Sequence, residues 1–264
     1  MSTKKKIILG VVVVAILGVL GGYGYILFIK EDAPEELTTT DLDAALDATT
    51  TVAATAAPAA SEAPADSTAT ADTATADTAA PATEAPAADA GDPSGTWNIS
   101  TDSVLGYRVS EVLGGVDTEG AGRTSQVTGS LTIDGTQATA AEFTVDMASI
   151  TSDSDRRDGQ FRDRIMSTAD FPTSTFVLTA PIDFGGVPAE GESITATATG
   201  DLTLRGVTNT VTFELTAKLE NGRIGVLGSI PVAFSDYQIP DPSNGFAEVK
   251  DNGLLEFVLV FDRA

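Results

Sequence analysis

Apolar and polar residues alternate along much of residues 97–264, and this alternation predicts β-strands. In VTFELTAKLE, at 211–220, every second residue is apolar and the residues between are Thr, Glu or Lys. The runs AEFTVDM, STFVLTA and LLEFVLVF, at 141–147, 174–180 and 254–261, repeat the pattern. Successive side chains of a strand point to opposite faces, so each run turns one face toward a core.

Two dipeptides between alternating runs predict tight hairpins. Asp134-Gly135 follows SLTI, and Asn221-Gly222 separates ELTAKLE from RIGVLG. Both dipeptides supply the positive φ angles that a two-residue hairpin requires. Strands that are consecutive in the sequence are therefore expected to be antiparallel neighbours. Many short strands with this spacing indicate an all-β sandwich or barrel.

The run TATATGDLTL turns its smallest residues to the dry side. That side reads Ala196, Ala198 and Gly200 before Leu202 and Leu204. Two explanations fit this pattern: another element packs very closely there, or the space is left for a ligand.

Residues 152–172 break the alternation and predict one short helix. Asp and Ser residues at its start are typical N-caps, and Pro172 follows its end. Phe161 and Ile165 are four residues apart, so they share one face of the helix. We expect this amphipathic helix to cross one end of the barrel, with its charged side outward.

The N-terminal region predicts a single transmembrane helix. Residues 1–6 are basic, and residues 7–29 are uncharged and mostly apolar. A helix of that length spans roughly 35 Å, which exceeds the bilayer core of about 30 Å. Lys4–Lys6 place the N-terminus in the cytoplasm and the folded domain outside it, at the cell membrane. A cleaved signal peptide is the alternative.

Residues 30–96 have the composition of a disordered linker. They consist mainly of Ala, Thr, Pro, Asp and Glu, with near-repeats such as ATADTATADTAAP. Such a segment buries too little apolar surface to offset its chain entropy. It fits a plain spacer, and its Thr and Pro content also permits a glycosylated stalk.

Composition excludes several kinds of chemistry. The chain of 264 residues has no Cys and no His, so it cannot form a disulfide or a Ser-His-Asp triad. Its formal net charge of −23 argues against nucleic acid as a partner, because phosphate binding depends on Lys and Arg.

A cluster of charged residues lies at the predicted helix. Arg157 and Arg162 are candidates for binding a phosphate or another polar head group. Pairing of these Arg residues with nearby Asp residues is the structural alternative. The acidic run at 153–158 lacks the Gly and Glu of a calcium-binding loop, so helix capping explains it better than a metal site.

Several motifs in residues 97–264 resemble the YceI-like family of polyisoprenoid-binding proteins. They are, in order, WNISTDS, VTGSLTIDG, VDMASITSD, RD before the helix, ADFPTSTF and GDLTLRGVT. The resemblance implies a lipocalin-like antiparallel barrel of about eight strands with an elongated apolar cavity for an isoprenoid lipid. Many relatives carry His near the first strand and after the RD motif, and this chain has none.

Three kinds of residue are candidates for lining a ligand cavity: aromatic residues, residues of the predicted helix, and the small residues of TATATGDLTL. Core packing is the alternative role for each aromatic residue. The set is Tyr107, Phe143, Phe161, Ile165, Phe171, Phe176, Ala196, Ala198 and Gly200.

The sequence predicts a membrane-tethered, extracytoplasmic protein that binds a long isoprenoid or quinone-like lipid without catalysis. It has no predicted catalytic residue, metal site or cofactor other than a bound lipid. The alternative is a surface module with a filled barrel that contacts a cell-wall polymer or another protein. An enzyme is the third hypothesis, and no motif supports it.

Overall fold

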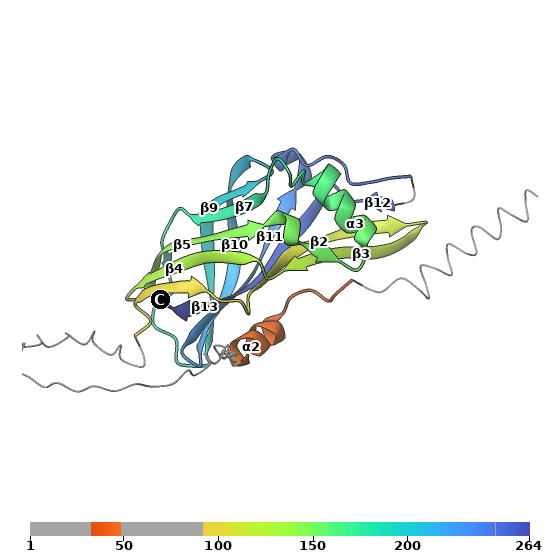
Figure 1. Cartoon of the computed structure of the whole chain (residues 1–264). Coiled ribbons are helices and arrows are strands. Elements are labelled where there is room, and N and C mark those ends of the chain that lie inside the picture. The colour runs from red at the N-terminus through yellow and green to blue at the C-terminus, as the bar shows by residue number, and fades with distance from the viewer. Residues whose placement is uncertain (1–32, 49–91, 246) are drawn as a thin grey trace, which may run out of the picture.

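The computed structural model describes residues 33–48, 92–245 and 247–264. Strands dominate residues 92–264, and one helix lies in the segment before them (Figure 1). The strands are β1 (Gly95–Ile99), β2 (Val104–Leu113), β3 (Val116–Thr124), β4 (Val127–Asp134), β5 (Gln137–Asp146), β6 (Thr151–Ser152), β7 (Thr173–Leu178), β8 (Ile182–Asp183), β9 (Ser193–Leu204), β10 (Val207–Glu220), β11 (Arg223–Ala233), β12 (Ala247–Val249) and β13 (Asn252–Arg263). The helical segments are α2 (Thr39–Asp47), η1 (Met147–Ser149), α3 (Asp155–Gln160), η2 (Phe161–Ile165) and η3 (Phe234–Tyr237).

The sheet closes into an eight-stranded antiparallel barrel, which is one of the two all-β architectures that the strand pattern indicated. The ring runs β1-β4-β5-β7-β9-β10-β11-β13 and returns from β13 to β1. At one end β2 replaces β1 as the neighbour of β13, and β3 pairs with β2. The hairpin of β2 and β3 therefore lengthens the wall there, and α3 lies across the same end (Figure 1).

Tight turns set the register of consecutive strands. Asn221 and Gly222 have φ angles of 56° and 71°, which is the backbone of a type I′ hairpin between β10 and β11. Gly135 takes a φ of 60° between β4 and β5. A third turn joins β9 to β10, where Arg205 and Gly206 have φ angles of 52° and 75°. The first two turns were predicted from their Asn-Gly and Asp-Gly dipeptides.

The N-terminal strap, residues 33–48, corrects the expectation that all of residues 30–96 lack structure. Within it, α2 lies against the outer face of β11 and β13 (Figure 1). Leu42 and Leu46 are fully buried there, together with Val258 and Val260. Four residues separate the two Leu side chains, so both fall on the same helix face. A Cβ atom at Gly225 would lie 2.5 Å from Leu42, so the Gly lets the helix approach closely.

Polar contacts hold both ends of the strap. Arg223 donates to the carbonyl oxygens of Ala45 and Ala48 at 3.2 and 3.0 Å, which satisfies the last turn of α2. At the other end, Arg108 donates to the carbonyl oxygen of Pro34 at 2.6 Å. The strap therefore runs along the barrel wall from α2 toward the end that α3 covers (Figure 1).

A buried carboxylate lies under the strap. Glu256 is 1% exposed and accepts hydrogen bonds from Arg108 at 3.2 Å and Arg123 at 2.9 Å. Two cations offset the cost of burying this charge, since an unpaired buried carboxylate is strongly unfavourable. Residues 254–261 thus carry buried side chains on both faces, because the strap covers the face that points away from the barrel interior.

No helix in the described part of the chain is long and apolar enough to cross a membrane. The predicted transmembrane segment, residues 7–29, lies outside the described residues, as does the linker at 49–91.

Candidate functional site

A cavity of about 600 Å³ occupies the end of the barrel beneath α3 and η2. Residues of β2, the start of β13 and the two helical segments form about half of its wall. Its volume lies within the range of about 300–1,000 Å³ that is usual for small-molecule sites. Apolar lining residues include Leu105, Val109, Leu113, Val145, Met147, Ile150, Leu204, Val232, Ile239, Val249 and Leu255.

The helical segment is anchored over this cavity by its own acidic residue. Asp158 is 6% exposed and accepts hydrogen bonds from the backbone N–H and the hydroxyl of Ser152 at 2.9 and 2.6 Å. The Ser154 hydroxyl accepts from the backbone N–H of Arg157 at 3.4 Å, as expected of an N-cap. These contacts give the acidic run a structural role.

Aromatic stacking joins the helical segment to the barrel wall. The rings of Tyr107 on β2 and Phe161 on η2 stack with centroids 5.0 Å apart and planes 9° apart. Both residues line the cavity, together with Ile165. Burial raises the pKa of the Tyr107 hydroxyl above its ordinary range, so the group stays neutral at physiological pH.

The most buried cation of the cavity wall is already paired. Arg157 donates to Glu111 at 3.1 Å and also forms an ion pair with Asp153. Its guanidinium lies close to Gly120, where a Cβ atom would come within 3.2 Å of Nε. Glu111 is itself only 7% exposed, so this polar cluster belongs to the wall rather than to open solvent.

The predicted site residues separate into three groups: one borders this cavity, a second borders another cavity, and a third borders neither. Tyr107, Phe161, Ile165 and Arg157 border the cavity. Phe143, Phe176 and Ala198 border a second, apolar cavity of about 100 Å³ in the barrel. Ligand contact remains a prediction for all of these residues.

Phe171 and Arg162 line neither cavity. Phe171 instead packs against the β9–β10 turn, where a Cβ atom at Gly206 would meet its ring at 2.7 Å. The guanidinium of Arg205 lies 5.7 Å from the centre of the same ring. Phe171 therefore stabilises a turn, and of the two head-group candidates only Arg157 borders the cavity.

At Gly200, the small residue of β9 makes room for a side chain and not for a ligand channel. A Cβ atom at Gly200 would lie 2.3 Å from the ring of Phe176. Ala196 packs against the core and lines neither cavity. Of the two explanations that the sequence left open, close packing holds at Gly200.

Sequence reasoning missed the β2 wall and the residues after β5. Val109, Glu111 and Leu113 follow Tyr107 at intervals of two and line the cavity with it. That alternation is visible in the sequence, but it does not show which strands surround open space. Ile150 belongs to the short segment between η1 and β6, where no periodicity marks it.

The substitution Gly200→Val is expected to destabilise the barrel by about 1–3 kcal/mol, because the new methyl groups overlap the ring of Phe176. Urea unfolding measures this loss. Gly159→Ala is the matched control, since a Cβ atom there has no neighbour within 4 Å and Ala favours the helix. Equal stability of the Gly200→Val variant and the unmodified protein would refute the close packing.

One solved structure that resembles this chain supports its architecture. A polyisoprenoid-binding domain from Saccharophagus degradans, implicated in plant cell wall breakdown, is 20% identical and has a TM-score of 0.53. The match covers 64% of this chain and 98% of that domain, and at this identity it supports the fold alone. Burkholderia cenocepacia BcnA is 24% identical with a TM-score of 0.48, over 61% of this chain and 98% of BcnA.

No match to this chain was found among curated proteins. The family model of the YceI-like domain matches residues 97–261, which comprise most of the chain and nearly all of the barrel. The chain therefore belongs to the YceI-like family.

Proposed function

We propose that this chain is a membrane-tethered, extracytoplasmic protein that holds the tail of a long isoprenoid or quinone-like lipid in its barrel, without catalysis. The cavity of about 600 Å³ carries the proposal, because its lining is mainly apolar. Burial of a lipid tail there is favourable by about 25 cal/mol per Å² before the costs of association. The polyisoprenoid binding of the Saccharophagus degradans domain supports the same ligand class.

The polar residues of the wall favour an uncharged head group. Two carboxylates already neutralise Arg157, so a phosphate would have to displace Glu111 or Asp153. The Tyr107 hydroxyl stays neutral and can donate to a carbonyl or hydroxyl oxygen. A quinone or a prenol suits these groups better than a pyrophosphate.

The strap supports a short tether between the barrel and the membrane. If residues 7–29 span a membrane, the covalent distance from Ile29 to Pro34 is at most about 17 Å. Pro34 is docked on Arg108, on the course that the strap takes toward the cavity end. The cavity would then lie near the bilayer surface, and a lipid would have a short path between the two.

The alternative, a surface module with a filled barrel, required a packed interior. The larger cavity argues against it. Cell-wall or protein partners of the outer surface remain compatible with lipid binding, but no specific feature favours them.

Equilibrium dialysis of the full chain in mild detergent tests the function, with labelled geranylgeraniol and menaquinone as probes. At about 0.3 kcal/mol per non-hydrogen atom, about 20 atoms predict a Kd of tens of micromolar or tighter. Saturable binding of one probe molecule per chain is expected. Failure of both probes to bind at any concentration below their solubility would refute the proposal.

A further inference from the structure

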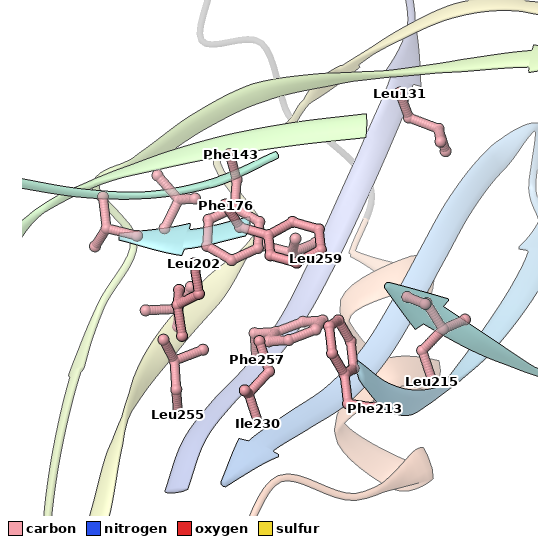
Figure 2. Close-up of a cluster of buried hydrophobic side chains, with 14 of the residues drawn as sticks. Leu131, Phe143, Phe176, Leu202, Phe213, Leu215, Ile230, Leu255, Phe257 and Leu259 are labelled. Atoms are coloured by element: carbon pink, nitrogen blue, oxygen red, sulfur yellow. The ribbon is translucent and has the colours of Figure 1, made fainter. Parts of the chain in front are cut away.

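Four Phe rings divide the barrel interior into two compartments. Figure 2 shows them between Leu202 and Leu255 on one side and Leu131 and Leu215 on the other. Their centroids form a closed cycle of contacts at 5.4–6.0 Å. We call this cycle the phenylalanine belt; its members are Phe143, Phe176, Phe213 and Phe257.

The belt occupies one layer of the barrel, between the two cavities. On β13, Leu255 borders the larger cavity, Phe257 belongs to the belt, and Leu259 borders the smaller cavity. Inward-facing residues alternate along a strand, so each layer is about 7 Å deep. The same order holds on two further strands: Val145, Phe143 and Ala141 on β5, and Ser174, Phe176 and Leu178 on β7.

The belt is tightly packed between the two compartments. Its four rings are 2–7% exposed, and the neighbouring Leu202 and Ile230 are 0% and 1% exposed. Two glycines leave room for two of the rings, because Cβ atoms at Gly200 and Gly228 would lie 2.3 and 2.5 Å from Phe176 and Phe257. Among the described residues, none lines both cavities.

We propose that the phenylalanine belt is a length stop that limits the isoprenoid chain this barrel accepts. The proposal rests on the lipid-binding function proposed above. The tail enters the larger cavity and ends at the belt, whereas the smaller cavity of about 100 Å³ is too small to hold a lipid by itself. A longer tail must displace a packed ring or leave its end in water.

Replacing Phe213 with a smaller residue is the most direct way to open the belt. Its ring contacts Phe176 and Phe257 and lines the smaller cavity. The substitution Phe213→Ala is expected to join the two cavities, and the milder Phe213→Leu to open a narrower passage between them. Ala198→Leu fills the smaller cavity and should cancel the gain when it is combined with Phe213→Ala.

The test measures the affinity of the full chain for farnesol, geranylgeraniol and solanesol, prenols of increasing length. The unmodified protein is expected to bind the longest prenol at least about tenfold more weakly than its best ligand, since poorly fitted methylenes change affinity by that order. Phe213→Ala should reduce this ratio to about threefold or less. Phe171→Ala is the control, because Phe171 lines neither cavity.

The outcomes distinguish the two proposals. If the unmodified protein binds none of the three prenols, the lipid-binding function fails. If it binds all three equally, or if both folded Phe213 variants keep the original length preference, lipid binding stands and the length stop fails. Circular dichroism identifies a variant that does not fold, in which case Phe213→Leu and the profile of the unmodified protein decide.

Discussion

The substitution Val109→Trp is expected to abolish lipid binding and to leave the barrel folded. Val109 lies on β2 with its side chain at the larger cavity, and it is half-buried because open space adjoins it. The indole is expected to fill much of that space. A pocket that lacks space for even one methylene of its ligand binds that ligand about tenfold or more weakly. Loss of much of the cavity should therefore weaken lipid binding at least about a hundredfold.

Equilibrium dialysis with geranylgeraniol measures this loss, and urea unfolding verifies the fold. Val177→Trp is the matched control, because Val177 is 46% exposed on the outer face of β7 and borders no cavity. Unchanged affinity in a folded Val109→Trp variant would place the lipid elsewhere.

The substitution Leu42→Asp is expected to release the N-terminal strap from the barrel. Leu42 of α2 is fully buried against the outer wall of the barrel, and the nearby Val258 and Val260 offer no partner for a carboxylate. Loss of a buried Leu side chain costs about 2–5 kcal/mol, and an unpaired charge adds to this cost. The barrel should remain closed, because its ladder does not include the strap.

Hydrogen exchange at residues 39–47 measures the release, and limited proteolysis supports it. Exchange of these amides is expected to accelerate strongly, while that of β10 and β13 stays slow. Ala44→Asp is the control, since Ala44 is exposed on the opposite side of α2. Protection of α2 in the Leu42→Asp variant would show that its polar contacts alone hold the strap.

Local patterns predicted the strands and hairpins well because they act over a few residues. Period-two alternation and the Asn221-Gly222 turn determine strands and hairpins without reference to distant residues. The Arg205-Gly206 hairpin has a weaker local signal, because Arg rarely adopts the positive φ that it has here. Its Gly was the only local signal.

The strap and the cavity depend on contacts between distant residues. The four-residue spacing of Leu42 and Leu46 predicts a helix face, but the disorder-prone composition around them concealed it. The small residue Gly200 admits two explanations until the register of β7 against β9 places Phe176 beside it. Sequence alone supplies neither that register nor the position of the open space.

Native mass spectrometry of the full chain, isolated from cells in mild detergent, tests the central claim most directly. The account predicts a single added mass that organic solvent releases and that proves to be an isoprenoid or quinone lipid. The Val109→Trp variant should carry no added mass. A lipid-free mass for the unmodified protein, unchanged after incubation with geranylgeraniol and menaquinone, would contradict the account.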